Sequence, residues 1–163
     1  MPVMRILTNG APELRKKAVT VPCIDDQVKT LAKDMIETMQ SEQGVGLAAP
    51  QVGKSLRLIV LQMPGQEPFA LINPRIIKRE GEREILEACL SIPGYEGMVK
   101  RSETIIARGF DCEGKPMRIK ARDLLSQAIE HEVDHLDGIL YPDRIEDKAK
   151  FYECEKTPGG TLE

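Results

Sequence analysis

Residues 123–137 constrain the fold of this chain more than any other segment, because a helix there carries ionisable side chains on its apolar side. The apolar residues of this predicted helix share one arc of a helical wheel. They are Leu124, Leu125, Ala128, Ile129 and Leu136. His131, Glu132 and His135, from the sequence HEVDH, fall on the same arc. Burying these groups without partners would cost several kcal/mol, so the sequence predicts an interior site that satisfies two imidazoles and one carboxylate.

The histidines of HEVDH are the only two in the chain. Their spacing places both imidazoles on one side of a helix, where a divalent metal ion can bind them and a water can satisfy the glutamate. The alternative is a chance match, in which the histidines form hydrogen bonds within the core. The opposite, polar arc of the helix consists of Ser126, Gln127, Glu130, Asp134 and Asp137.

Length and charge indicate one globular domain. The chain has 163 residues, of which 41% are hydrophobic and 30% charged, and this is enough to bury a core. We expect a single domain over residues 1–147 and a short polar tail over 148–163. The net charge of −3 predicts no direct binding to nucleic acid, although a local basic patch is compatible with it.

The sequence shows no secretory signal and no membrane-spanning segment. The first residues, MPVMRILTNGAP, lack an apolar stretch, and the longest apolar run, LRLIVLQM, is too short to cross a bilayer. We therefore expect a cytoplasmic protein without membrane contact, whose four cysteines are thiols. At least one of them is then free to bind a metal ion.

The apolar pattern predicts an α+β domain, with antiparallel or mixed sheets around the central C-terminal helix. Residues 25–42 form an N-terminal amphipathic helix, since their apolar residues recur at helical spacing. The glycine-rich segment GVGLAAPQVG (44–53) is expected to be a loop, and PGYEG (93–97) a turn. The expected strands lie at 56–62, 69–72, 75–79, 83–91, 98–101, 103–111 and 116–121, with a short helix at 11–17.

A catalytic metal ion needs a third protein ligand besides the two histidines. Zinc proteases take a glutamate or histidine downstream of HExxH, but here the downstream glutamates lie in the polar tail or close to it. Upstream, Cys89 in EILEACLSIPG ends an apolar run and could complete a Cys/His/His set with an open fourth position. The alternative for Cys89 is a small buried core residue.

Three segments, in order along the chain, resemble the three signature motifs of the peptide deformylase family. They are GVGLAAPQ (44–51), EACLS (87–91) and HEVDH (131–135). INP (72–74) and HLDGILYPDRI (135–145) are similar to that family as well, so the resemblance covers nearly the whole chain. It implies a metal-dependent enzyme that hydrolyses the formamide of the N-terminal formyl-methionine of new polypeptides and releases formate.

The resemblance also implies the roles of the central residues. Cys89, His131 and His135 bind one divalent metal ion, Fe(II) in the cell, with Zn, Ni or Co tolerated. Glu132 takes a proton from water and delivers it to the leaving amine. The Gln51 side-chain amide and the Leu90 backbone N–H stabilise the oxyanion.

Substrate and supporting residues follow from the same resemblance. The substrate main chain pairs with residues 44–46, where Val45 and Gly46 lie, like an added strand. Candidates for the methionine pocket, besides Val45, are Ile85, Leu124 and Ala128, for which plain core packing is the alternative. Glu87 and Arg101 resemble a family ion pair that supports the cysteine strand; otherwise they are two surface charges.

The sequence departs from the family pattern at three places. Ala88 stands where the family has glycine, and a positive φ there would strain an alanine by about 1 kcal/mol or more. Glu130 stands where glutamine is common, on the polar arc of the helix. From the sequence we expect no long basic C-terminal helix of the kind that some bacterial members use for ribosome contact.

We expect a monomer in a bacterial-type cytoplasm, or in an organelle, that meets formylated nascent peptides and contacts the ribosome only transiently. Two other functions are compatible with the motifs. One is an HExxH metallopeptidase, against which the missing downstream ligand counts. The other is a catalytically weak, deformylase-like binder of formyl-peptides, which only Ala88 favours. The terminal pair Leu162 and Glu163 carries no prediction.

Overall fold

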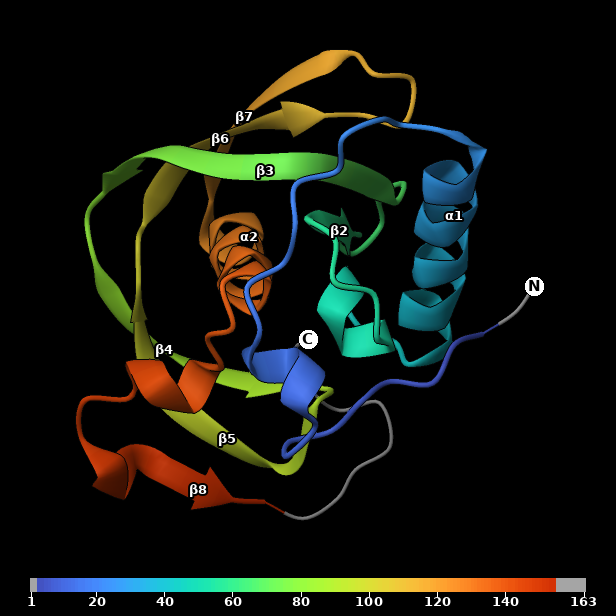
Figure 1. Ribbon diagram of the computed structural model, residues 1–163. Coiled ribbons are helices and arrows are strands. Elements are labelled where there is room, and N and C mark those ends of the chain that lie inside the picture. The colour runs from blue at the N-terminus through green and yellow to red at the C-terminus, as the bar shows by residue number, and fades with distance from the viewer. Residues whose placement is uncertain (1–2, 155–163) are drawn as a thin grey trace.

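The computed structural model describes residues 3–154 (Figure 1) and has the expected α+β architecture. The two long helices are α1 (Asp26–Ser41) and α2 (Asp123–Leu136). The strands are β1 (Gly46–Ala48), β2 (Leu58–Leu61), β3 (Phe69–Glu80), β4 (Arg83–Cys89), β5 (Ile92–Arg101), β6 (Thr104–Phe110), β7 (Pro116–Arg122) and β8 (Phe151–Glu153). The short 3₁₀ helices are η1 (Pro12–Arg15), η2 (Ala49–Val52), η3 (Tyr141–Arg144) and η4 (Lys148–Lys150).

Five strands form one antiparallel sheet in the order β1-β2-β3-β6-β7. Two strands expected at 69–72 and 75–79 are joined in the single strand β3, whose pairing with β6 shifts between Ile72 and Arg75. Asn73 lies at this irregularity with φ of 53°, and its side chain accepts from and donates to the backbone of Val21. The sequence INP therefore bends a strand and does not end it.

The second sheet has the order β4-β5-β8. The prediction of a turn at residues 93–97 was wrong, because these residues lie inside β5. Residues 148–153, assigned to the polar tail, form η4 and the strand β8, which pairs with β5. Tyr95 and Phe151 stack across this pair with ring centroids 5.2 Å apart. The rest of the predicted tail, 155–163, lies outside the described residues.

The glycine-rich segment 44–53 is not a loop, as its composition suggested, but contains β1 and η2. Backbone pairing of β1 with β2 brings Leu47 opposite Val60. Residues 46–52 are buried, so the glycines serve close packing instead of a solvent-exposed turn. The segment ends at Gly53, whose φ of 84° is readily adopted only by glycine.

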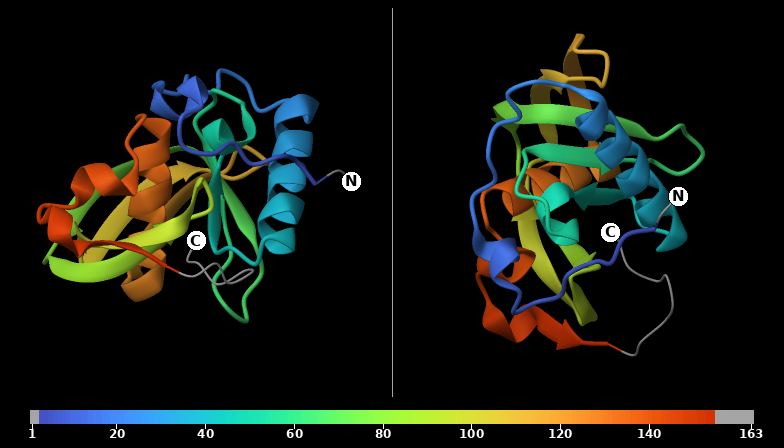
Figure 2. Two further views of the ribbon diagram at one scale, coloured as in Figure 1. Left: turned by 90° about the horizontal axis from the view of Figure 1, so that it is seen from below. Right: turned by 45° about the vertical axis from the view of Figure 1, so that its right-hand side comes forward.

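Helices α1 and α2 cover opposite faces of the first strands of the five-stranded sheet (Figures 1 and 2). Leu58 and Val60 of β2 pack with α1, whereas Ile59 and Leu61 pack with α2. This burial on both faces explains why β2 is apolar at every position. Within residues 3–154, no helix has the length and apolar character needed to span a membrane.

Helix α2 runs through the centre of the molecule, between the five-stranded sheet and the β4–β5 hairpin (Figure 1). Every residue from Ser126 to Leu136 is buried. The assignment of Ser126, Gln127, Glu130 and Asp134 to a polar outer arc was therefore wrong. Their partners are side chains and backbone groups of the surrounding strands and loops, which a helical wheel does not contain.

Candidate active site

Cys89 and the two histidines of α2 meet in the interior. Cys89 is the last residue of β4, and His131 and His135 lie one turn apart on the helix. Their ligand atoms all lie within 4.8 Å of one another, and all three residues are buried. The Cys89 Sγ lies 3.3 Å from the His135 Nε2. Among residues 3–154 no other such group of histidine, cysteine or acidic residues exists.

Glu87 orients the imidazole of His131. Its Oε2 contacts the His131 Nδ1, which leaves the other ring nitrogen to face the cysteine and so fixes the tautomer. Arg101 donates to both carboxylate oxygens of Glu87 at 2.9 and 2.6 Å. Although burial alone would raise it, the pKa of Glu87 is held well below its ordinary value by His131 and Arg101. Glu87 and Arg101 are thus a buried pair and not two surface charges.

The same arginine continues the network to α2. Arg101 donates to the Asp134 Oδ2 at 2.9 Å, and Arg144 of η3 donates to both oxygens of Asp134 at 3.0 and 2.8 Å. One carboxylate of α2 is therefore held by two arginines from other elements. This role was not predicted, because Asp134 was assigned to the polar arc and Arg144, although it lies in HLDGILYPDRI (135–145), was given no role.

Glu130 belongs to a second buried cluster on α2. Its carboxylate accepts from the Ser102 backbone N–H at 2.8 Å and hydroxyl at 2.7 Å, and from Arg79 at 3.0 Å. Glu130 is therefore a hydrogen-bonded part of the interior, although the helical wheel placed it on the polar arc. A carboxylate suits this place because all three partners are donors.

Glu132 lies beside the metal-binding group with an unsatisfied oxygen. Its side chain is buried, and its Oε1 has no hydrogen-bond partner in the described part of the chain. Burial raises the pKa of Glu132 to about 7, near the value at which a carboxylate can both accept and release a proton at neutral pH. Its other oxygen packs against the β1 backbone: a Cβ on Gly46 would lie 2.6 Å from the Glu132 Oε2.

Gln51 points its amide nitrogen at the cysteine. Its Oε1 accepts from the Ala48 backbone N–H at 2.9 Å, which fixes the orientation of the amide group. Its Nε2 then lies 3.1 Å from the Ser91 Oγ and 3.7 Å from the Cys89 Sγ. Ser91 also donates its backbone N–H to the same sulfur at 3.4 Å. Ser91 was visible in the motif EACLS, but no chemical role pointed to it.

The N-terminal segment holds this part of the site from outside. Leu7 donates its backbone N–H to the carbonyl oxygen of Gln51, and Asn9 donates its N–H to that of Ser91, both at 2.7 Å. The same short segment thus binds Gln51 and Ser91, which are far apart in sequence. It therefore helps to position both Gln51 and the turn between β4 and β5 that follows Cys89.

The predicted pocket residues fall into two groups. Val45, Leu124 and Ala128 belong to the apolar cluster between α2 and the five-stranded sheet. Ile85 packs instead with the cluster that contains Cys89. Leu90 lies in the turn between β4 and β5, where its side chain would be 3.3 Å from a Cβ placed on Gly44.

Ala88 does not need the left-handed conformation. The non-glycine residues with positive φ in residues 3–154 are Gln43, Asn73 and Asp123. Ala88 is a buried residue of β4, where its methyl group causes no backbone strain. The expected cost of an alanine at this position is therefore absent.

The residues present fit a divalent metal ion. A thiolate and two imidazoles are a common three-ligand set, and such catalytic sites keep a fourth position for water or substrate. The unpartnered Glu132 oxygen beside them is the group that such a water would satisfy. A buried set of this kind with an adjacent glutamate defines a metal-dependent hydrolase.

Comparison with known proteins gives the particular family. The model of the family described as polypeptide deformylase matches residues 3–151. The chain is 53% identical to a peptide deformylase of Dehalococcoides mccartyi, over 94% of this chain and 92% of that protein. It is 49% identical to a peptide deformylase of Dictyoglomus turgidum, over 93% and 98%.

Solved structures show the same similarity. A crystal structure of a peptide deformylase from Synechococcus elongatus, in complex with actinonin, has a TM-score of 0.88 and 40% identity, covering 92% of this chain and 82% of that one. The peptide deformylase of Thermotoga maritima has a TM-score of 0.87 and 36% identity, over 90% and 100%. The chain belongs to the polypeptide deformylase family, whose members are metalloenzymes that remove the N-formyl group from nascent polypeptides.

Proposed function

We propose that Cys89, His131 and His135 hold the metal ion with which this enzyme deformylates nascent chains, and that Fe(II) is the ion in the cell. The observation that carries the proposal is the convergence of their three ligand atoms within 4.8 Å in the interior. A thiolate with two imidazoles suits Fe(II), Zn, Ni and Co alike. When bound, the metal ion lowers the pKa of water and polarises the formyl oxygen.

Glu132 acts as the general base and then as the general acid. Its raised pKa of about 7 lets it take a proton from water and deliver it to the leaving amine. Gly46 supports this role, since the absent side chain makes room for the carboxylate against the β1 backbone. Glu87 and Arg101 contribute indirectly by orienting His131.

Gln51 and Leu90 stabilise the oxyanion that forms from the formyl group. The Gln51 amide is anchored through its oxygen, so its nitrogen is already directed into the site before substrate binds. The Leu90 backbone N–H follows directly after Cys89, in the turn of the hairpin. Neither donor is charged, so neither competes with the ligands for the metal ion.

The substrate main chain adds to the edge of the five-stranded sheet. Strand β1 is the first strand of this sheet and pairs with β2 on one side, so its other edge is the place for an added strand at Val45 and Gly46. The methionine side chain then lies against Val45, Ile85, Leu124 and Ala128, which contribute only apolar surface.

The cellular setting completes the proposal. We propose a cytoplasmic monomer that meets formylated peptides as they are synthesised and touches the ribosome only transiently. The substrates are linear peptides with an N-terminal formyl-methionine. Within residues 3–154 no downstream glutamate joins Cys89, His131 and His135, and Glu146 pairs with Lys100, so this part of the chain gives a peptidase function no support.

Formate release from formyl-Met-Ala-Ser tests the proposal. Protein purified without oxygen and loaded with Fe(II) or Ni(II) should release formate, and Glu132→Gln should reduce kcat by roughly 10²- to 10⁴-fold with an unchanged metal content. Cys89→Ala should lose both metal and activity. The matched control is Glu153→Gln on β8, which should keep both. Absence of formate from the metal-loaded protein, or full activity of Glu132→Gln, would refute the proposed roles.

A further inference from the structure

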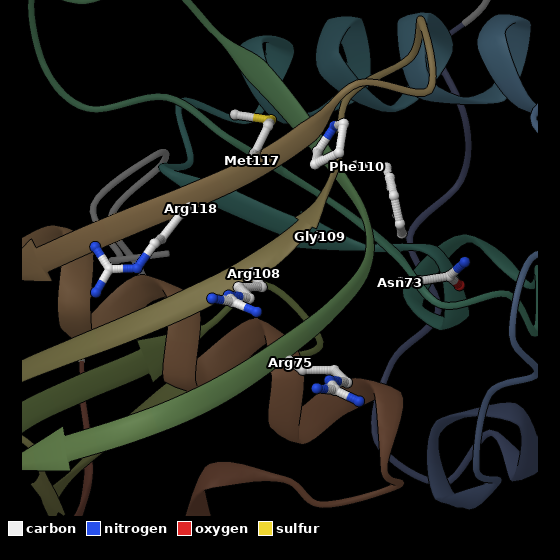
Figure 3. A pocket seen from close by; sticks show the side chains of 8 residues that line it. Asn73, Arg75, Arg108, Gly109, Phe110, Met117 and Arg118 are labelled. Carbon is white, nitrogen blue, oxygen red and sulfur yellow. The ribbon is translucent and has the colours of Figure 1, made fainter.

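The outer face of the five-stranded sheet carries a row of arginines. Arg75 of β3 lies opposite Arg108 of β6, and Arg108 lies opposite Arg118 of β7. Figure 3 shows the three side chains, one from each of three neighbouring strands. All three are exposed, and they lie on the side of the sheet away from α2, since the alternate residues Ala107 and Ala121 pack with that helix.

No acidic group neutralises this row within the described residues. Arg75, Arg108 and Arg118 take part in none of the ion pairs or side-chain hydrogen bonds of residues 3–154. Strands β6 and β7 contain no aspartate or glutamate at all, and β7 adds Lys120 and Arg122 at its exposed positions. Like charges on directly opposed residues destabilise a sheet, so the row costs stability in a protein whose net charge is negative.

The row borders a shallow hollow with an aromatic wall. Arg75, Arg108 and Arg118 line this hollow together with Phe110 and Pro116. Phe110 is 39% exposed and so offers aromatic surface at the hollow. Cationic side chains that track a backbone, combined with an exposed aromatic ring, are the two elements of single-strand nucleic-acid binding.

We propose that this arginine face binds the phosphate backbone of RNA. Neighbouring strands are about 4.8 Å apart, so three arginines in a row present a continuous line of positive charge. Arginine binds phosphate through two parallel hydrogen bonds. A polyanion with one charge per nucleotide matches such a line better than isolated carboxylates do, and Phe110 supplies a surface for an unstacked base.

The inference revises the expectation, drawn from net charge alone, that the protein does not bind nucleic acid. It identifies a surface of the protein that could make the proposed contact with the ribosome. The choice of RNA as the ligand rests on that proposed contact, whereas the arginine face itself does not. The face lies on the far side of the sheet from Cys89 and the two histidines. RNA binding and deformylation of a free tripeptide are therefore separable, and either can fail alone.

Fluorescence anisotropy with labelled single-stranded RNA of about 12 nucleotides tests the proposal. The variant Arg75→Gln/Arg108→Gln/Arg118→Gln should lose at least roughly tenfold in affinity at low salt. The slope of log affinity against log KCl concentration should decrease in magnitude by about 2, since each phosphate contact contributes about 0.7 for a single strand. Phe110→Ala should weaken binding without changing that slope.

The matched control is Lys16→Gln/Lys17→Gln/Lys54→Gln, which removes the same charge from exposed lysines outside the sheet and should keep RNA affinity. Both triple variants should release formate from the tripeptide at the rate of the unaltered protein. The arginine variant should unfold at the same or a higher temperature, since it relieves repulsion. RNA affinity equal in the two triple variants, no RNA binding at about 50 mM KCl, or equal affinity for poly-glutamate would overturn the proposal.

Discussion

Helices α1 and α2 are similar in length but solve the problem of burial in different ways. Helix α1 has one apolar face against β2, with Met35 and Met39 fully buried, and leaves its other face to solvent. Helix α2 is surrounded by protein and buries the ionisable residues Glu130, Glu132 and Asp134 beside the apolar residues that face the sheet. In α1 the sequence pattern and the environment agree, whereas in α2 the polar residues are satisfied by arginines and serines from other elements.

The difference shows where each helix obtains its stability. Removing apolar contacts should unfold α1, whereas removing one charge should unfold α2, because a partner then remains buried without compensation. Because arginines and serines from other elements bind its polar side chains, α2 also holds His131 and His135 in fixed positions. Helix α2 thus positions the residues of the site, whereas α1 stabilises the sheet by packing against β2.

The largest effect is expected for Asp134→Ala on α2. The change leaves the buried Arg101 without one of its two carboxylates and Arg144 without both of its bonds, so stability should fall by about 3 to 5 kcal/mol. The matched change, Asp34→Ala on α1, should stay within about 0.5 kcal/mol. Urea unfolding of both variants measures the difference, and equal losses would break the comparison between the helices.

Met39→Ala on α1 should have the next largest effect. Met39 is fully buried among the residues that join α1 to β2, and its truncation leaves a cavity that costs about 2 to 4 kcal/mol. Formate release per folded molecule should not change, because Met39 belongs to the apolar cluster that joins α1 to β2 and not to the cluster that contains Cys89. A loss of kcat with retained stability would show that α1 also shapes the site.

Glu130→Gln on α2 should destabilise the protein by about 1 to 2 kcal/mol, although glutamine is common at this position in the family. The amide would direct donor hydrogens towards the donors of Ser102 and Arg79. A thermal double-mutant cycle with Ser102→Ala measures the coupling. If Glu130→Gln left the stability unchanged or raised it, this part of α2 would tolerate the replacement of one polar residue by another, as the exposed face of α1 does.

The smallest effect concerns the start of α1. Asp25 accepts the Val28 backbone N–H at 3.0 Å, so Asp25→Ala should cost about 1 kcal/mol and Asp25→Ser much less. Helix α2 has no side-chain cap at its N-terminus and relies on burial instead. Chemical unfolding of the two variants would sharpen the contrast, and equal losses would assign the effect to charge and not to capping.

The secondary structure was predicted well where apolar residues recur at regular helical spacing. The helix expected at 25–42 spans Asp26–Ser41, and that expected at 123–137 spans Asp123–Leu136. Strand β1 was missed because its glycines suggested a loop. Of β5, the part expected at 98–101 was predicted, and the first part was missed because PGYEG (93–97) is typical of a turn. In both cases pairing with a neighbouring strand overrode local preference.

Site residues that belong to a sequence motif could be predicted. Site residues that are close in the fold but lie in unrelated segments could not. The two histidines were found from their spacing, and Cys89 was assigned through the resemblance of EACLS to a family motif; the structure brings the three residues together. Ser91, Asp134 and Arg144 were not assigned roles, because their bonds connect segments that no sequence period relates. Long-range polar contacts of this kind become visible only after folding.

The division of the metal-binding group between β4 and α2 has a consequence for biosynthesis. During translation the Cys89 thiol emerges long before His131 and His135, and the N-terminal segment emerges before its partners Gln51 and Ser91. With the proposed ligands, metal binding therefore has to wait until α2 has been synthesised and packed. Each molecule becomes able to process other nascent chains only after its own α2 has been synthesised and folded.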